Sequence, residues 1–341
     1  METVIYQCPN CGGSLQFDPD TQQYQCEYCQ SQFDQLDMDK KAEEQNTQDY
    51  FSAMLYHCPS CGAEIVTDDT TAATFCFYCH NPVVLTGNLK GQYQPDQIIP
   101  FMIDLEKAME IFQGWLKKKK YLPSDFFSAD QIEKISGVYF PYWLYHCKID
   151  GKLDANGRKR KVWTTGRTEF TETKTYHIAR NGEMNVDCVP RNALKKADRR
   201  LVDSVLPFNM DQLKGFSMGY LSGFFAEKRD LEKDEFLQEV TSEVKEFAVG
   251  SLKNNMNFYQ DITVNHCETT IRDEKWSYAL FPVWTLTYSD KRTNRIYYFA
   301  CNGENGKICG ELPVDQKKLI LLFATIFISV FILMLIMGYL I

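Results

Sequence analysis

The sequence predicts four structural parts in order: two small rubredoxin-like β ribbons in tandem, an α+β domain, and one C-terminal transmembrane helix. Three observations predict this. Most of the cysteines form a duplicated pattern, helix-like and strand-like segments alternate through the middle of the chain, and the last 23 residues carry no charge. The expected boundaries are 1–34 for the first ribbon, 35–55 for an acidic linker, 56–86 for the second ribbon, 96–313 for the α+β domain and 319–341 for the transmembrane helix.

The cysteine pattern predicts two metal sites. Eight of the 13 cysteines form two copies of C-x2-C-x14-C-x2-C, and neighbours such as Gly12 and Gly62 repeat with them. A period shared by cysteines and their neighbours indicates an internal duplication. Two Cys-x2-Cys pairs about 15 residues apart are the spacing of a four-thiolate zinc site. The expected metal ligands are Cys8, Cys11, Cys26, Cys29, Cys58, Cys61, Cys76 and Cys79.

The metal is expected to be structural. A stretch of about 25 residues buries too little apolar surface to fold alone, whereas structural zinc contributes roughly 10–16 kcal/mol to such modules. A catalytic zinc keeps one position open for water, and four cysteines leave none. Two structural Zn²⁺ ions are therefore expected, with no catalytic or cofactor-binding residues. Iron stays an alternative, because knuckles of the CPxCG form also occur in rubredoxin-like redox sites.

The end of the sequence predicts a membrane anchor. The segment from Leu319 to Ile341 has no charged residue, and at 1.5 Å per residue it is roughly 34 Å long, enough for a hydrocarbon core of about 30 Å. Lys317 and Lys318 precede it, and positive flanks favour the cytoplasmic side. Reduced cysteines agree with that side. The expectation is a tail-anchored, single-pass protein of the cell membrane with most of its chain in the cytoplasm.

The charge of the ribbon region bears on its partners. The first 90 residues contain three basic residues and 13 acidic ones. Nucleic acid is bound mainly through lysine and arginine, so nucleic-acid binding by the ribbons is not expected. An acidic pair of small modules instead favours a protein partner that carries basic residues.

The middle of the chain alternates between helical and strand patterns. Helices are expected over 104–121, 193–202 and 230–256, and a short helical turn over 130–135. Strands are expected over 138–153 and 262–309, with a hairpin over 162–178. The segments FPYW and FPVW, beginning at Phe140 and Phe281, suggest two related β units, although coincidence in an aromatic-rich chain would also explain them. This order of elements favours the α+β class.

No recognisable active site occurs in the sequence. It lacks a glycine-rich phosphate loop, a serine elbow and an HExxH motif, so no enzymatic activity is expected. Five further cysteines have no assigned role: Cys147, Cys188, Cys267, Cys301 and Cys309. Because Cys301 and Cys309 flank an expected hairpin turn, a thiol redox protein stays an alternative. Three basic clusters, at 117–120, 158–161 and 195–200, are interpreted as solvated surface or as surfaces facing anionic lipid.

Several segments together resemble one family. They are the two tandem CPxCG knuckles, GVYFPYWLY, YLSGFFAEKRD, FPVWTL and NGENGKICGELPVD. The chain resembles the YdjG-like family of bacterial tail-anchored, TFIIB-type double zinc-ribbon membrane proteins. The resemblance implies a link to SPFH-domain and phage-shock proteins in membrane-stress response. It implies recruitment of such partners to the membrane, with a second membrane protein among them, and not catalysis.

The functional hypothesis is a membrane-anchored cytoplasmic adaptor that recruits protein partners to the lipid bilayer through its zinc ribbons. Two alternatives remain open at this point. One is a nucleic-acid-binding zinc-ribbon regulator, and the other is a membrane-tethered thiol redox protein.

Overall fold

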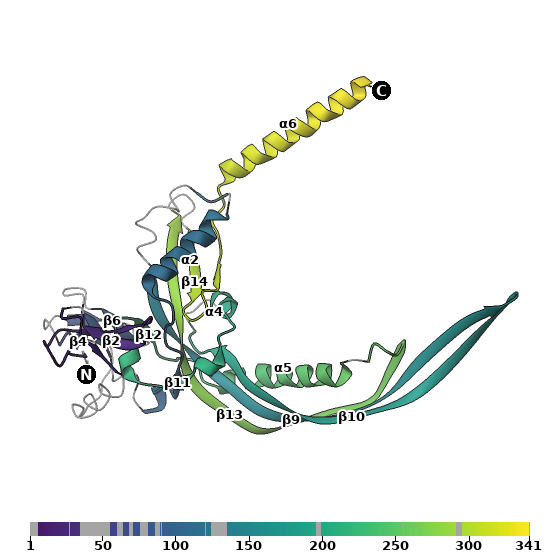
Figure 1. Ribbon diagram of the computed structural model, residues 1–341, viewed down its shortest axis with the longest axis horizontal. Helices are drawn as coiled ribbons and strands as arrows, with labels where there is room; N and C mark the ends of the chain where they lie inside the picture. The colour runs from purple at the N-terminus through teal and green to yellow at the C-terminus, as the bar shows by residue number, and fades with distance from the viewer. Residues whose placement is uncertain are drawn as a thin grey trace. The chain divides into compact units, whose positions relative to one another are not determined.

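The computed structural model describes most of the chain (Figure 1). The described residues are 6–26, 28–34, 55–59, 64–67, 71–75, 81–85, 89, 91–119, 121–123, 135–195, 199–254, 256–290 and 295–340. The chain forms two compact units. Unit 1 comprises Met1–Pro141, Leu194–Lys228 and Leu280–Ile341, and unit 2 comprises Tyr142–Ala193 and Arg229–Ala279.

Most of the described secondary structure is β. The strands are β1 (Leu15–Asp18), β2 (Gln23–Cys26), β3 (Gln32–Phe33), β4 (Leu55–His57), β5 (Glu64–Val66), β6 (Thr71–Phe75), β7 (Pro82–Val84), β8 (Gln97–Ile98), β9 (Ser136–Thr165), β10 (Thr168–Asn192), β11 (Lys214–Gly215), β12 (Phe225–Glu227), β13 (Asp261–Asp290), β14 (Arg295–Asn302) and β15 (Ile308–Gly310). The helices are α2 (Leu105–Lys117), α4 (Arg199–Ser204), α5 (Asp234–Lys253) and α6 (Gln316–Leu340), with short 3₁₀ turns η2 (Gly91–Tyr93), η4 (Met210–Gln212) and η5 (Met218–Leu221).

The strands form three sheets. The largest has ten strands, in the order β11-β8-β13-β9-β12-β6-β7, with β10 paired to β9, β14 to β13 and β15 to β14. The strands β1-β2-β3 form a separate three-stranded sheet, and β4-β5 form a two-stranded one. The two segments FPYW and FPVW lie on β9 and β13, which are neighbours in the large sheet.

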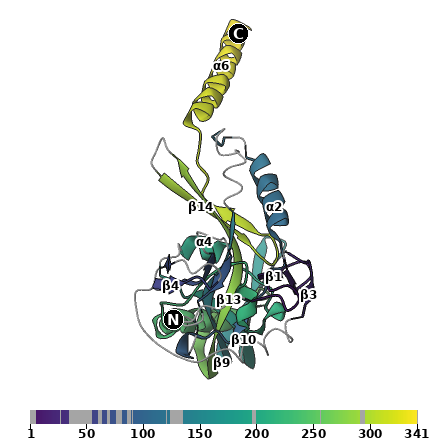
Figure 2. The ribbon, with the colours of Figure 1, turned by 90° about the vertical axis from the view of Figure 1, so that its left-hand side faces the viewer.

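In unit 1 the first ribbon packs against the turn η5. Figure 2 shows β1 and β3 as part of a small purple sheet. The Phe17 ring of β1 meets the Tyr220 ring edge-on at 4.9 Å between centroids, and the Phe17 N–H donates to the Ser222 carbonyl at 3.1 Å. A Cβ at Gly219 would collide with the Tyr24 ring, so the absence of a side chain there permits the close approach.

An aromatic cluster centres on Phe101 in unit 1. Phe101 stacks on Phe224 at 4.2 Å and meets Tyr139 at 5.0 Å and Trp284 at 4.9 Å. Helix α2 begins after its N-cap Asp104, whose carboxylate accepts from the Lys107 N–H. The buried face of α2 places Phe112 against Phe299 of β14, with 5.8 Å between centroids, so the helix covers this part of the sheet.

Unit 2 is built on the long strands β9 and β10, most of β13, and the helix α5. Strands β9 and β10 pair from Tyr142 opposite Asn192 to Thr165 opposite Thr168, and α5 lies alongside them (Figure 1). The buried residues of α5 recur at helical spacing, as expected for an amphipathic helix on a sheet. They are Phe236, Val240, Val244, Ala248 and Leu252.

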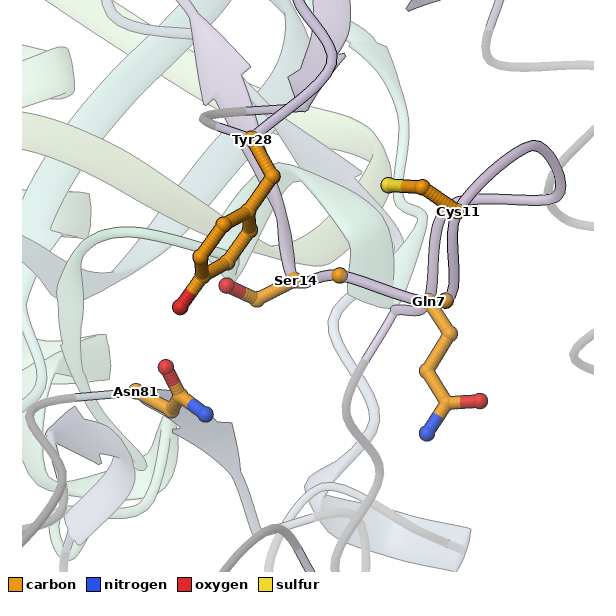
Figure 3. A pocket seen from close by; sticks show the side chains of 7 residues that line it. Gln7, Cys11, Ser14, Tyr28 and Asn81 are labelled. Carbon is orange, nitrogen blue, oxygen red and sulfur yellow. The ribbon is translucent and has the colours of Figure 1, made fainter.

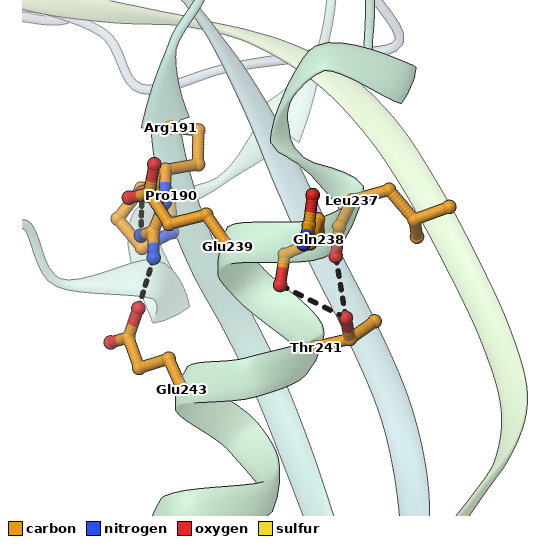
Figure 4. A network of polar contacts seen from close by, with 7 residues as sticks. All are labelled: Pro190, Arg191, Leu237, Gln238, Glu239, Thr241 and Glu243. Atoms are coloured by element: carbon orange, nitrogen blue, oxygen red, sulfur yellow. Dashed lines mark hydrogen bonds and ion pairs between the residues drawn. The ribbon is translucent and has the colours of Figure 1, made fainter.

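Arg191 of β10 forms ion pairs with two glutamates of α5 (Figure 4). The Arg191 side chain is only 13% exposed, and its Nε lies 3.3 Å from Glu239 Oε1. Its second guanidinium nitrogen pairs with Glu243, and a third bond goes to the Pro190 carbonyl at 2.9 Å. The two carboxylates are one helical turn apart, so one guanidinium reaches both.

The predicted α+β class for 96–313 is wrong. This region is predominantly a large β-sheet, in which β9, β10 and β13 run for 30, 25 and 30 residues. The accompanying helices α2, α4 and α5 have only 13, 6 and 20 residues. Of the predicted helix over 193–202, the structure forms only α4, and the predicted helical turn over 130–135 lies almost entirely outside the described residues.

The predicted membrane span also requires correction. Among the helices formed by described residues, none combines the length and the apolar character that crossing a bilayer requires. This finding overturns the predicted transmembrane helix, the tail anchor and the single-pass membrane localisation.

Candidate metal centre

The first cysteine pair is held by a tight backbone turn. The Cys8 N–H donates to the Gly13 carbonyl at 2.7 Å, and the Gly12 N–H donates back to the Cys8 carbonyl at 2.8 Å. Gly12 has φ +73°, in the left-handed region that favours glycine. The turn therefore favours glycine at the position after the second cysteine.

The second cysteine pair, which begins at the last residue of β2, has the same turn geometry. The Gln30 N–H donates to the Cys26 carbonyl at 2.8 Å, and the Cys26 N–H donates to the Ser31 carbonyl at 3.0 Å. Gln30 has φ 58° and takes the place that Gly12 has in the first turn. The two turns bring their four sulfurs together.

The four sulfurs gather closely enough to hold one ion. Cys8 Sγ lies 3.5 Å from Cys29 Sγ, Cys11 Sγ lies 3.4 Å from Cys26 Sγ, and all four lie within 4.8 Å of one another. Zinc–sulfur bonds of about 2.3 Å in a tetrahedron separate the sulfurs by roughly 3.8 Å. The donor set and the spacing therefore fit a tetrahedral thiolate metal site formed by Cys8, Cys11, Cys26 and Cys29.

Hydrogen bonds around the cluster orient its sulfurs. Backbone N–H groups of Gly13 and Ser31 donate to Cys11 and Cys29. The Ser31 hydroxyl lies 3.2 Å from Cys29 Sγ and accepts from the Asn10 side-chain amide at 2.9 Å. Such outer contacts commonly tune a metal site. Cys8 and Cys26 are buried whereas Cys11 and Cys29 are exposed, so one side of the cluster faces solvent.

The thiols of the cluster differ in acidity. Hydrogen bonds from the Ser31 hydroxyl and N–H lower the pKa of Cys29 to about 6. The Gly13 N–H lowers the pKa of Cys11, but the neighbouring thiols of Cys26 and Cys29 outweigh it and raise this pKa to about 12. The protons of these interacting thiols therefore leave in separate steps that belong to the cluster as a whole. A metal ion binding four thiolates would release such protons.

The second cysteine set lies largely outside the described residues. Cys58 is described and buried, whereas Cys61, Cys76 and Cys79 are not among the described residues. In the described part of the chain, the first set is the one cluster of three or more potential metal ligands. The structure therefore supports one metal site, and the second zinc ion stays a prediction.

Comparison with known proteins identifies a relative along almost the whole chain. No protein-family model matches, and no solved structure matches. The chain is 33% identical over 326 residues to the uncharacterized protein YdjG of Bacillus subtilis (strain 168). The aligned region covers 95% of this chain and 94% of the relative. The chain belongs to the YdjG family. The name of the YdjG relative gives no activity, so this comparison shows the family of the chain but does not indicate a reaction or a ligand.

A pocket lies beside the metal centre of this YdjG family member (Figure 3). Its volume is about 350 Å³, and it is lined by Gln7, Cys11, Gly12, Gly13, Ser14, Tyr28 and Asn81. The buried Ser14 hydroxyl has no hydrogen-bond partner among the described residues, whereas Tyr28 is 73% exposed. The sequence pattern located the cysteines but gave no signal for this pocket, because Asn81 reaches it only through the fold.

The other cysteines do not form a second reactive centre in the described residues. Cys301 and Cys309 are not joined by a disulfide, and burial raises the pKa of Cys301 to about 12 and that of Cys309 to about 11. Both are thus protonated at neutral pH, where a thiol is a poor nucleophile. This state gives no support to the thiol redox alternative.

One contact in unit 2 was not predicted from the sequence. Cys188 Sγ lies 3.9 Å from His146 Nδ1, although the two residues are 42 positions apart. In the sequence the cysteine adjacent to His146 is Cys147. Burial raises the pKa of Cys188 and lowers that of His146, so both groups are neutral and form no thiolate–imidazolium pair. Cys147 is buried, and Cys267 packs against the apolar cluster around Leu252.

Proposed function

We propose that this protein is an adaptor whose metal-folded first ribbon binds a protein partner. The observation that carries the proposal is the asymmetry of this ribbon. Its hairpin is buried against η5, whereas its metal side is open around Tyr28 and the adjoining pocket. A module fixed on one side and exposed on the other is suited to presenting a surface.

The buried side argues for a rigid presentation. Besides the Phe17 contacts, the Ser222 hydroxyl donates to the Leu15 carbonyl at 2.6 Å, and the Gln22 amide donates to the Phe101 carbonyl at 2.8 Å. These bonds join the ribbon to parts of unit 1 that are far away in sequence. A preorganised surface loses little conformational entropy when a partner binds.

The charge of the ribbon suggests the chemistry of the partner. Residues 6–34 contain four acidic residues and no lysine or arginine, and a site with four thiolates around Zn²⁺ carries a further charge of about −2. Both features favour a partner surface rich in basic residues. The family resemblance suggests an SPFH-domain or phage-shock-type protein as this partner.

The metal is proposed to be structural zinc. Four thiolates fill a tetrahedral shell and leave no position for substrate water, so the ion would hold the two turns together without taking part in catalysis. Iron in the same site would give a coloured protein, and the absorption spectrum of the purified chain separates the two metals.

Photo-crosslinking tests the proposal. A photoreactive phenylalanine replaces Tyr28 at the open face. A control chain carries the same residue in place of Tyr298, another exposed tyrosine of unit 1 (47% exposed). We expect irradiation in cells to join one protein to position 28 and not to position 298, and a Cys8→Ser substitution to abolish the adduct. Absence of an adduct at position 28, or the same adducts at both positions, would contradict the proposal.

A further inference from the structure

The end of the β9–β10 hairpin has a charge opposite to that of the ribbon. Residues 156–177 contain six basic residues and two acidic ones, in a chain with a net charge of −8. The basic residues are Arg158, Lys159, Arg160, Lys161, Arg167 and Lys174. This hairpin lies entirely within unit 2, and its side chains from 161 to 170 are all exposed.

The pairing of the strands places lysines and aromatic rings on one face. Trp163 pairs with Phe170, Lys159 pairs with Lys174, and Tyr176 lies opposite Gly157. Alternate side chains along a strand share a face, and directly paired residues share it too. Lys159, Lys161, Trp163, Phe170, Glu172, Lys174 and Tyr176 therefore share one face, the lysine–aromatic stripe, while Arg158 and Arg160 lie on the opposite face. Glu172 lies opposite Lys161 and pairs with Lys174 at 3.2 Å, so three lysines and one glutamate leave the stripe with a net positive charge.

The rings of the stripe are ordered and accessible. Trp163 and Phe170 stack with 5.7 Å between centroids and 15° between planes, and they remain 43% and 44% exposed. Lys161 Nζ lies 5.9 Å from the Trp163 centroid, and Lys159 Nζ lies 5.9 Å from that of Tyr176. Tyr176 itself is supported by Tyr259 at 5.7 Å. The stripe thus presents flat apolar faces beside cations.

We propose that the lysine–aromatic stripe binds single-stranded nucleic acid. Proteins that bind single strands combine lysine and arginine along the phosphate backbone with aromatic rings on which bases stack. From Gly157 to Trp163 the stripe is roughly 20 Å long at about 3.3 Å per residue, room for a few nucleotides. An acidic polypeptide would satisfy the lysines but does not carry an aromatic ring at every repeat to stack on three exposed rings, as a nucleic acid does, so we favour nucleic acid.

Fluorescence anisotropy of a labelled 15-nucleotide oligo(dT) with the full chain tests the proposal. Two variants remove two charges each from the same strand. Lys159→Gln with Lys161→Gln changes the stripe, and Arg158→Gln with Arg160→Gln changes the opposite face. Each phosphate contact contributes about 0.7 to the slope of log K against log salt for single strands. We expect the stripe variant to reduce this slope by about 1.4, and the control to leave it unchanged.

Trp163→Ala tests the stacking. We expect it to weaken oligo(dT) binding roughly 5- to 150-fold, the range measured for base–aromatic stacking, while Val162→Ala on the opposite face has no effect. Because Trp163 is exposed, circular dichroism should show both variants folded. Equal effects of the two charge variants, or polyglutamate binding as tightly as oligo(dT) with no loss in Trp163→Ala, would overturn the proposal and indicate an acidic protein partner.

Discussion

At the residue scale, Phe17 joins the metal ribbon to the rest of unit 1. Its ring is 3% exposed and contacts Tyr24 and Tyr220. We expect Phe17→Ala to lower the free energy of unfolding by about 3–5 kcal/mol, because it removes a buried ring and leaves a cavity. Urea denaturation measures the loss. Tyr28→Ala, which removes a 73% exposed ring of the same ribbon, should change stability by less than about 0.5 kcal/mol, and equal losses would contradict this account.

Asp20 is a second residue whose role can be tested. Burial and the nearby carboxylate of Asp104 raise its pKa, so the folded state holds the proton more tightly than the unfolded state. Ionised Asp20 therefore weakens folding at neutral pH, and this penalty disappears as the pH falls below the usual value for aspartate. We expect Asp20→Asn to raise the unfolding free energy at pH 7 by a few tenths of a kcal/mol, the scale of exposed charge pairs.

A double-mutant cycle distinguishes this explanation from a simple packing effect. Adding Asp104→Asn should give less than the sum of the two single effects, because both substitutions remove the same repulsion. Thermal unfolding at pH 7 measures the cycle. Gains that simply add would contradict the electrostatic cause.

At the scale of elements, Arg191 determines how firmly α5 is held on β10. We expect Arg191→Met to destabilise unit 2 by about 1–3 kcal/mol, since hydrogen bonds to charged groups contribute on this scale. Lysine should not restore the loss, because it cannot reach Glu239 and Glu243 with one planar group. Hydrogen exchange of the α5 amides reports the change. Lys245→Met, on the exposed side of α5, should leave exchange as it is in the parent chain.

The length of β9 shows why the sequence predicts only part of the fold. The strand expected from the sequence ends at Leu153, although Asp150-Gly151 within it and Asn156-Gly157 after it both have the sequence of a hairpin turn. In the structure both glycines lie inside β9, where a Cβ would collide with Leu252 at Gly151 and with Tyr259 at Gly157. Each glycine is there for close packing and not for a turn. That distinction depends on residues about 100 positions away, which local patterns do not contain.

The candidate site, like the fold, is predicted only in part by the sequence. The four cysteines of the first ribbon follow from spacing, because ligand geometry is set within each short turn. The pocket beside them and the Cys188–His146 contact depend on tertiary structure. Cys188 also sits at φ 55° where the β9–β10 register shifts, and such a bulge changes which residue faces His146. No sequence period signals that change.

At the scale of the whole molecule, the two units should depend differently on metal. The ligands Cys8, Cys11, Cys26 and Cys29 all lie in unit 1. Structural zinc contributes roughly 10–16 kcal/mol to the module that binds it, so its loss should unfold the first ribbon. Unit 2 has its own apolar cluster, formed by residues such as Leu153, Ile178 and Met256, and contains none of these ligands. Chelation should therefore abolish protection in 6–34 and spare α5.

Hydrogen exchange with metal analysis of the full chain tests this prediction. We expect Cys26→Ser to lower the metal content by one ion per chain and to expose the amides of β1 and β2, while the α5 amides keep their protection. Cys267→Ser, a partly buried thiol of unit 2, is the matched control and should leave the metal content unchanged. If chelation leaves 6–34 protected, packing against η5 alone holds the ribbon. If α5 loses protection as well, the units fold as one cooperative body and the metal supports both.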